Sequence, residues 1–188
     1  MGEARSAAVS GPGRATALAE PVAAVLAPAL AALALARYGL SGEGALAAAF
    51  TTVLVVLASI DFKEHRLPNS IVFPSIAVAL AWQGVLHPDR MIEWLAAGAG
   101  ASLFFLVPQL VYRGGVGMGD VKLAFLIGLV LGQAVIPAIF VATVGASVAA
   151  LAVLAVRGRS ARKAAIPYGP FLAAGAALAI LTDIGSPF

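Results

Sequence analysis

The chain has 188 residues, of which 61% are hydrophobic and 11% are charged. An average soluble domain has about 45–50% apolar and about 25% charged residues, so this composition excludes an ordinary soluble enzyme and predicts a polytopic membrane protein. The sequence contains no cysteine, which excludes disulfides and thiolate-ligated zinc or iron–sulfur sites. The net charge of +3 does not indicate nucleic-acid binding, because the basic residues fall in short segments between apolar stretches, where they set membrane orientation.

A helix needs about 20 apolar residues to cross the core of a bilayer. By that measure the predicted spans cover residues 17–36, 45–60, 70–86, 91–111 and 165–182, together with a longer apolar run over residues 121–156. The long run is too long for one crossing and short for two, and Gly132, Gln133 and Pro137 mark the expected turn between two short helices. We therefore expect an all-α, polytopic transmembrane helix bundle of about seven spans, or six if residues 121–156 cross once.

The distribution of basic residues favours seven spans, because short cytoplasmic loops collect Lys and Arg. With a cytoplasmic N-terminus, seven spans place ten of the twelve basic residues inside, whereas six would place residues 157–163 outside. Residues 1–16, rich in Ala, Gly and Ser, are predicted to form a mobile cytoplasmic tail, and residues 17–188 a single membrane-embedded domain. The first apolar stretch is longer than the core of a cleaved signal sequence, which disfavours its removal.

Two acidic residues lie at the ends of predicted spans, where an ionisable side chain is costly enough to suggest function. Asp61 ends the second span, ahead of a basic segment that closes with Leu67-Pro68-Asn69, and Asp120 opens the fifth in Gly117-Met118-Gly119-Asp120-Val121-Lys122. Two complete spans separate the aspartates, and an even number of crossings returns the chain to the same side. Both carboxyl groups are therefore expected at the same, cytoplasmic end, however residues 121–156 are divided.

Two carboxyl groups that meet in a poorly solvated pocket share a proton and titrate as a coupled pair. One can act as general base on a water molecule while the other donates a proton to a scissile carbonyl, which is aspartic-peptidase chemistry without metal or cofactor. The glycines at residues 114–119 would let the backbone approach a substrate closely beside Asp120, and the phosphate-binding pattern is absent. On position alone, helix capping or ion pairing with Lys63, Arg66 or Lys122 is the alternative for both aspartates.

A different class of protein, a small proton- or cation-coupled membrane transporter, would use the same two aspartates as an ion site. Transporter ion sites lie near the bilayer midplane, whereas Asp61 and Asp120 lie at span ends, which favours the peptidase. Other polar residues have simpler interpretations. His65 and His87 are expected on opposite sides of the membrane as solvated loop residues, and Trp82 and Trp94 near the outer interface as anchors.

In three stretches the chain resembles the type IV prepilin peptidases, membrane aspartic endopeptidases of the GxGD group. The stretches are Asp61 with the segment ending in Leu67-Pro68-Asn69, then Gly117 to Lys122, and Ile166-Pro167-Tyr168-Gly169-Pro170-Phe171 in the last span. Together they cover the order and spacing of the family core from about residue 45 to the end. The resemblance implies that Asp61 and Asp120 are the catalytic pair. It places Gly117, Gly119, Lys122, Pro68 and Asn69 near the substrate, with interface anchoring expected for Lys122 and helix capping for Asn69.

Such enzymes cleave the short basic leader from prepilins and pilin-like proteins, usually just after a Gly and before an apolar helix that stays in the bilayer. The resemblance implies a multi-pass protein of the bacterial cytoplasmic (inner) membrane whose site faces the cytoplasm. Its expected partners are a prepilin-type substrate and membrane lipid, with no nucleic acid, cofactor or metal; it implies no oligomeric state. Long family members carry a cytoplasmic insert with paired CxxC motifs and also methylate the new N-terminus, so this cysteine-free chain is expected to be a peptidase only.

Overall fold

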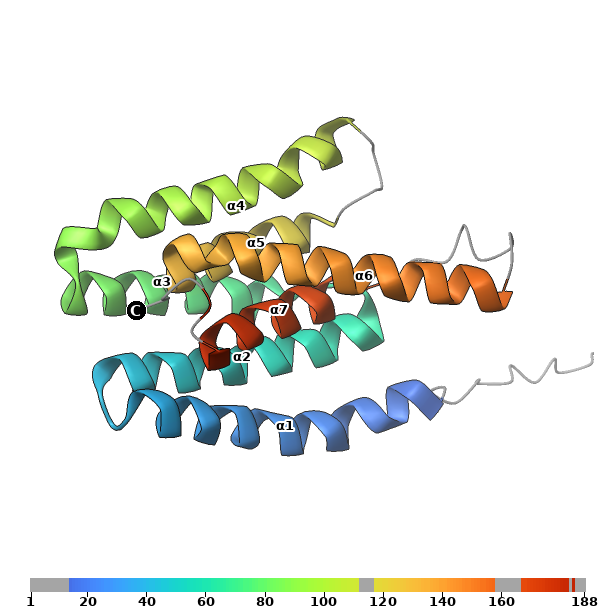
Figure 1. The fold of residues 1–188 in the computed structure, drawn as a ribbon, viewed down its shortest axis with the longest axis horizontal. Helices are drawn as coiled ribbons and strands as arrows, with labels where there is room; N and C mark the ends of the chain where they lie inside the picture. Colours follow the sequence, from blue (N-terminus) through green and yellow to red (C-terminus); the bar gives the residue numbers. More distant parts are fainter. Residues whose placement is uncertain (1–13, 112–116, 158–166, 183, 185–188) are drawn as a thin grey trace, which may run out of the picture.

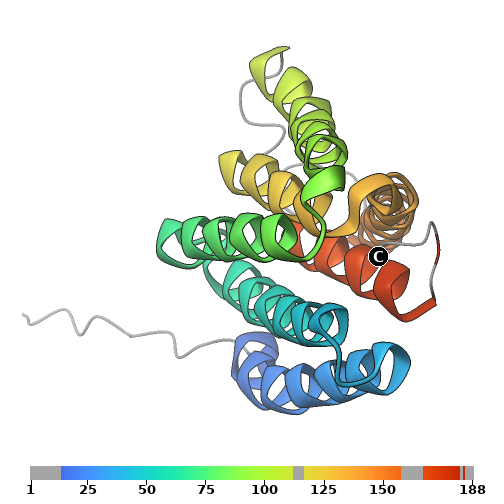
Figure 2. The same cartoon turned by 90° about the vertical axis from the view of Figure 1, so that its left-hand side faces the viewer.

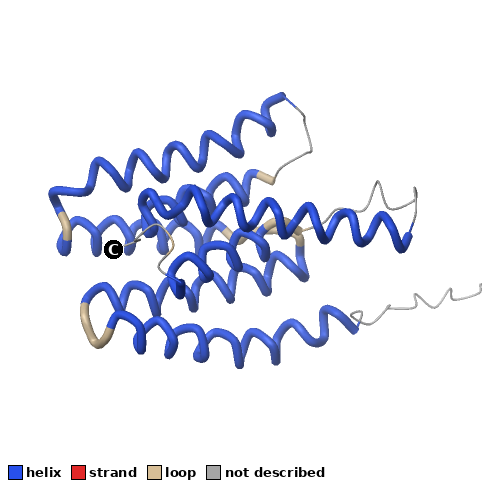
Figure 3. Tube along the Cα trace, in the orientation of Figure 1, coloured by secondary structure: helices blue, strands red, loops and turns tan. Residues whose placement is uncertain are grey.

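The computed structural model describes residues 14–111, 117–157, 167–182 and 184. Within these ranges the chain forms seven α-helices and two 3₁₀ turns, with no strand (Figures 1 and 3). The helices are α1 (Arg14–Tyr38), α2 (Gly42–Glu64), α3 (Asn69–Leu86), α4 (Met91–Val111), α5 (Met118–Leu131), α6 (Val135–Arg157) and α7 (Gly169–Thr182), and the turns are η1 (Pro88–Arg90) and η2 (Gly132–Ala134). The predicted all-α helix bundle is confirmed.

Successive helices run in alternating directions along the long axis of the molecule (Figure 1). In the end view, α1 and α4 lie at opposite edges of the bundle, and α2, α3, α5 and α7 lie between them (Figure 2). The end of α2 and the starts of α3, α5 and α7 therefore point toward the same end of the bundle, at the right in Figure 1. The two predicted site segments, around residues 61–69 and 117–122, both belong to this end.

Five stretches of the described chain are long and apolar enough to cross a bilayer, namely Glu20–Tyr38, Gly42–Glu64, Asn69–Leu86, Pro88–Val111 and Met118–Val156. The last stretch contains both α5 and α6, which reverse direction at η2, so the expected division of residues 121–156 is present. The expectation of two short helices is wrong for α6, which has 23 residues. The helices α5 and α7 have 14 residues each, or about 21 Å, less than a full crossing.

Part of the sequence-based picture lies outside the described residues. This holds for residues 1–13 of the predicted tail, whereas residues 14–16 already belong to α1. It also holds for residues 158–163 of the basic cluster and for residues 114–116 of the glycine-rich loop.

The reversal between α5 and α6 depends on Gly132. Its φ of +56° lies in the left-handed region that favours glycine. A Cβ atom here would lie 2.6 Å from the Trp94 ring, which is fully buried against it. The expectation that Trp94 anchors the outer interface is therefore wrong, because the ring fills the space that Gly132 leaves. Pro137, expected in the turn, lies instead in the first turn of α6, where a missing N–H costs no helical hydrogen bond.

Close packing around α5 forms the centre of the core. Ten of its fourteen residues are buried. Where α4 and α5 cross, a Cβ atom on Gly128 would lie 2.5 Å from the Cα atom of Gly98, so small residues allow the two backbones to touch. Asp120 thus lies in the first turn of a helix that is packed in the middle of the bundle.

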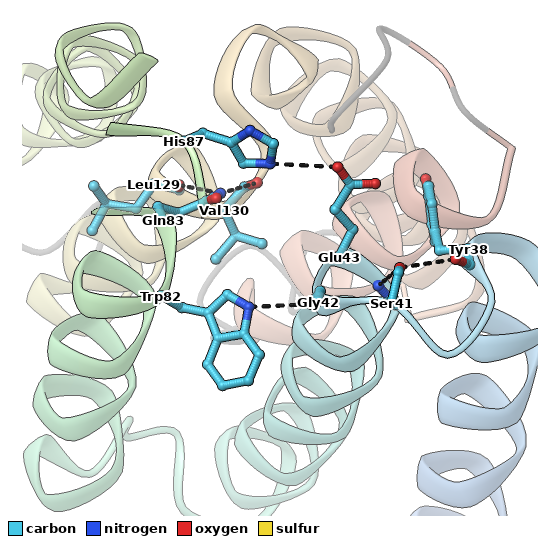
Figure 4. Close-up of polar contacts among 10 residues, drawn as sticks. Tyr38, Ser41, Gly42, Glu43, Trp82, Gln83, His87, Leu129 and Val130 are labelled. Atoms are coloured by element: carbon cyan, nitrogen blue, oxygen red, sulfur yellow. Dashed lines mark hydrogen bonds and ion pairs between the residues drawn. The ribbon is translucent and has the colours of Figure 1, made fainter. Parts of the chain in front are cut away.

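Polar contacts join α2, α3 and α5 at the end of the bundle opposite Asp61. They link Trp82 Nε1 to the Gly42 carbonyl (3.1 Å), Gln83 Nε2 to the carbonyls of Leu129 and Val130 (3.4 and 3.3 Å), and His87 Nε2 to the Glu43 carboxylate (3.4 Å; Figure 4). The expectation that His87 is a solvated loop residue is wrong, because its side chain is half-buried between Glu43 and the edge of Trp94. Side-chain contacts therefore connect α2, α3 and α5 at this end.

Candidate active site

Asp61 lies in the last turn of α2 and is 6% exposed. The helix ends at His65, an exposed residue with a left-handed φ of 52°, whose N–H donates to the carbonyl oxygen of Asp61 at 2.8 Å. The side-chain Oδ2 of Asp61 accepts the N–H of Gly169, the first residue of α7, at 3.1 Å. The first N–H groups of a helix lack intrahelical partners and carry partial positive charge. The carboxylate of Asp61 is therefore stabilised by the start of another helix.

Asp120 is the third residue of α5 and is 8% exposed. Its Oδ2 accepts the N–H of Gly117, the N-cap residue, at 3.3 Å. This is one half of a capping box; the other half cannot form because glycine has no side-chain oxygen. Asp120 thus caps its own helix, as the alternative interpretation expects, but with a side chain turned into the bundle.

The fold brings the two carboxyl groups to the same end of the bundle, as the parity of the spans requires. Asp61 lies in the last turn of α2 and Asp120 in the first turn of α5, and both side chains are buried. Neither has a cationic partner among the described residues, since Lys63 pairs with Glu20 and Lys122 with Asn69. Two buried carboxyl groups that lie close together can share one proton.

The segment after Asp61 packs against the segment before Asp120. A Cβ atom on Gly119 would lie 3.0 Å from the Cβ atom of Leu67, so the absence of a side chain at Gly119 lets this contact form. Pro68 is the N-cap residue of α3 in an extended conformation. Gly117 is exposed at the start of α5, where its backbone holds Asp120. The two aspartate-bearing segments therefore support each other.

Lys122 and Asn69 form a polar pair beside the site. The Nζ of Lys122 donates to Oδ1 of Asn69 at 2.8 Å and lies 5.0 Å from the centre of the Phe73 ring. The expected capping role of Asn69 is wrong, because Pro68 occupies the N-cap position and the Asn69 side chain points to Lys122. The pair joins α3 to α5 two residues beyond Asp120.

Gly169 is the site residue that sequence reasoning did not single out. A Cβ atom at this position would lie 2.6 Å from Oδ2 of Asp61, so only glycine allows the carboxylate to approach the backbone of α7 this closely. The available signal was a glycine between Tyr168 and Pro170 at the start of an apolar span. That signal indicates a special backbone position but not its partner, which is 108 residues away in sequence.

Tyr168 precedes α7 and contacts two other helices. Its hydroxyl lies 2.7 Å from Oγ1 of Thr143 in α6, and its ring packs at 5.5 Å against Phe105 in α4. Tyr168 therefore connects the start of α7 to both α6 and α4.

An apolar groove of about 420 Å³ runs between α1, α2 and α7 and ends beside the site. Ala58 and Phe62, which line it, flank Asp61 on α2, and Pro170 follows Gly169 on α7. Among the described residues, no group of three or more His, Asp or Glu side chains could hold a metal ion. The arrangement at this end thus offers two carboxyl groups bordered by apolar surface.

The model of the type IV leader peptidase family matches residues 48–155, a stretch that includes both aspartates and the contacts between Leu67 and Gly119. The chain belongs to the type IV leader peptidase family. In this chain, α7 and its Gly169 lie beyond the matched stretch, although Gly169 contacts Asp61 directly.

Named relatives agree with this assignment. The chain is 35% identical over 163 residues to the prepilin leader peptidase/N-methyltransferase of Bacillus subtilis, covering 86% of this chain and 65% of the relative. It is 33% identical over 178 residues to the protein of the same name from Burkholderia pseudomallei, covering 89% of this chain and 55% of the relative. The leader peptidase HopD of Escherichia coli is 29% identical over 131 residues, covering 66% of this chain and 84% of the relative. The chain therefore spans between half and two thirds of the length of the first two, and no solved structure matches it.

Proposed function

We propose that this chain is a membrane aspartyl endopeptidase that cleaves the basic leader from type IV prepilins or pilin-like proteins at the cytoplasmic face of the inner membrane. The observation that carries the proposal is the burial of Asp61 and Asp120 at one end of the bundle with no cationic partner among the described residues. Family membership supports leader peptides as substrates, and the names of the relatives support prepilins.

In the proposed reaction Asp61 and Asp120 share one proton at the start. The ionised carboxylate removes a proton from a water molecule as the water oxygen bonds to the scissile carbonyl carbon, and the protonated carboxyl donates its proton to the carbonyl oxygen. Collapse of the tetrahedral intermediate breaks the C–N bond, the leaving amine takes a proton from the pair, and the hydroxyl oxygen returns one. The pair ends with one proton, as it began, and no covalent bond forms between the substrate and the enzyme.

The surrounding residues have supporting roles in this proposal. The exposed backbone at Gly117 leaves room for an extended peptide beside Asp120, and Gly119 lets Leu67 pack against the start of α5. Lys122, Asn69 and Pro68 form the neighbouring wall, and the hydrogen bond between Lys122 and Asn69 supports a shared positioning role for these two.

We propose that this chain is a peptidase without N-methyltransferase activity, which is supported by its lack of cysteine. The test is co-expression with a pilin-like protein from the same host, followed by mass spectrometry of the pilin N-terminus. The expected product has lost its basic leader directly before the apolar segment and carries an unmodified new amine. Uncut precursor for every pilin-like protein of that host would overturn the peptidase assignment, and a methylated product would overturn the single activity.

The proposed orientation predicts which end of the bundle faces the cytoplasm. Glu64 is exposed at the site end and Asp89 is exposed at the opposite end. Because the chain has no native cysteine, the Glu64→Cys and Asp89→Cys variants each carry one thiol. In intact cells a membrane-impermeant maleimide applied outside should label the Asp89→Cys variant through the periplasm and leave Glu64→Cys unlabelled until the inner membrane is opened. The reverse pattern would contradict a cytoplasmic site.

A further inference from the structure

The peptide group that joins Tyr168 to Gly169 is held on both sides. Its carbonyl oxygen accepts the N–H groups of Phe171 and Leu172 at 3.0 and 3.1 Å, and its N–H donates to Oδ2 of Asp61 at 3.1 Å. A peptide group is planar, so its C=O and N–H bonds turn together. Whatever fixes this plane also fixes the direction of the hydrogen bond to Asp61.

The side chain of Tyr168 adjoins this peptide group and hydrogen-bonds to a neighbouring helix. Its hydroxyl lies 2.7 Å from Oγ1 of Thr143, and Oγ1 of Thr143 lies 2.8 Å from the carbonyl oxygen of Ile139. A hydroxyl has a single proton. The proton of Thr143 goes to the Ile139 carbonyl, which can only accept, so the hydroxyl of Tyr168 donates to Thr143. The contact therefore has a defined direction.

The surroundings make this hydrogen bond difficult to replace. Thr143 is exposed on the isolated protein, but it lies on α6 within Met118–Val156, a stretch long and apolar enough to cross a bilayer. In a bilayer we therefore expect acyl chains rather than water around it. A hydroxyl that loses its partner there finds no solvent to bond. The hydrogen bond that connects Tyr168 to α6 therefore has no competition from water. The Tyr168 ring also packs against Phe105 of α4.

We propose that Tyr168 is a positioning residue: its hydrogen bond to Thr143 fixes the first peptide group of α7, so that the N–H of Gly169 stays directed at Asp61. Tyr168 acts through Gly169 and does not touch the scissile bond. This inference rests on the proposed peptidase function for its kinetic consequence, although the geometry that it describes can be measured without any substrate.

The kinetic test compares Tyr168→Phe and Thr143→Val with wild type. Phenylalanine keeps the ring against Phe105, so Tyr168→Phe removes only the hydrogen bond to Thr143. Valine keeps the shape of threonine, and Thr143→Val removes this hydrogen bond together with the one to the Ile139 carbonyl. One hydrogen bond is worth about 0.5–1.5 kcal/mol, so we expect kcat to fall about three- to tenfold with KM unchanged. Thr143→Ser retains the hydroxyl and should restore wild-type kcat.

The chain offers a matched control at the other end of the same helix. The hydroxyl of Tyr38 donates to the carbonyl oxygen of Ile180, near the end of α7, at 2.9 Å. Tyr38→Phe therefore removes a comparable tyrosine hydrogen bond to α7 far from Asp61, and it should leave kcat unchanged. Equal losses in Tyr38→Phe and Tyr168→Phe, or wild-type kcat in Tyr168→Phe, would overturn the proposal.

A second measurement needs no substrate and separates this inference from the proposed function. The Asp61→Cys variant places one thiol at the start of α7, where a helix N-terminus lowers thiol pKa values. Its pKa, read from alkylation rates across pH, should rise by about 0.4–1 unit when Tyr168→Phe is added and stay constant when Tyr38→Phe is added. Identical values in all three backgrounds would overturn the positioning role even in an active enzyme, and the expected shift in a protein that cuts no pilin would overturn only the peptidase assignment.

Discussion

Replacing either Asp61 or Asp120 by asparagine is expected to lower leader cleavage by at least about a hundredfold, since proton transfer by a positioned group contributes about 10²–10⁴-fold. Asparagine has nearly the same shape as aspartate and can still accept the N–H of Gly169 or Gly117. It cannot hold or release the shared proton. Rates are measured in isolated membranes with a pilin-like substrate.

The folding of these variants distinguishes lost chemistry from lost structure. Buried carboxyl groups are unfavourable in a folded protein where they lack a counter-ion, and none is present among the described residues. The thermal stability of Asp61→Asn and Asp120→Asn should therefore equal or exceed that of wild type. Asp89→Asn is the matched control, because Asp89 is exposed at the opposite end of the bundle, and it should cleave at the wild-type rate. A stable Asp61→Asn protein with wild-type activity would contradict the carboxyl pair.

Gly169→Ala is expected to lower activity by about tenfold to a hundredfold, because the new Cβ atom would lie 2.6 Å from Oδ2 of Asp61. Glycine at this position does not have a positive φ, so alanine can adopt the backbone conformation and the effect is steric. Relief of the clash must move the carboxylate or the start of α7, and a displacement of about 1 Å at a reacting group costs about 10²-fold. Stability should fall by about 1–3 kcal/mol, as for other overpacked sites.

Gly100→Ala is the control for that prediction. Gly100 lies on α4, and no atom lies within 4 Å of where its Cβ atom would be. An alanine in a helix is more favourable than glycine by about 0.5–1 kcal/mol, so this variant should be fully active and slightly more stable. Equal activity in Gly169→Ala and Gly100→Ala would contradict the close approach of Asp61 to α7.

The sequence predicts the features that depend on local hydropathy and on the number of spans between two residues. Apolar runs locate the helices within a few residues, and the parity of two spans is sufficient to bring Asp61 and Asp120 to the same end. The turn at Gly132 follows from a glycine inside a run that is too long for one crossing. These features are set by chain length, hydropathy and backbone conformation, all of which can be read one segment at a time.

The contacts that support the site depend on partners that are distant in sequence. Gly169 contacts Asp61 across 108 residues, and Asn69 accepts from Lys122 across 53. Tryptophan is a residue type that anchors spans at the interface, but the side chain of Trp94 is buried because it packs against Gly132. For such residues side-chain chemistry permits several roles, and only the packing of one helix against another selects among them.

The central claim is that Asp61 and Asp120 together cleave a prepilin-type leader. It is tested most directly by the intact mass of a pilin-like protein co-expressed with wild type, Asp61→Asn, Asp120→Asn or Asp89→Asn. The account predicts loss of the basic leader with wild type and Asp89→Asn, and full-length precursor with each of the other two. Cleavage by either Asp61→Asn or Asp120→Asn, or intact precursor with wild type, would contradict it.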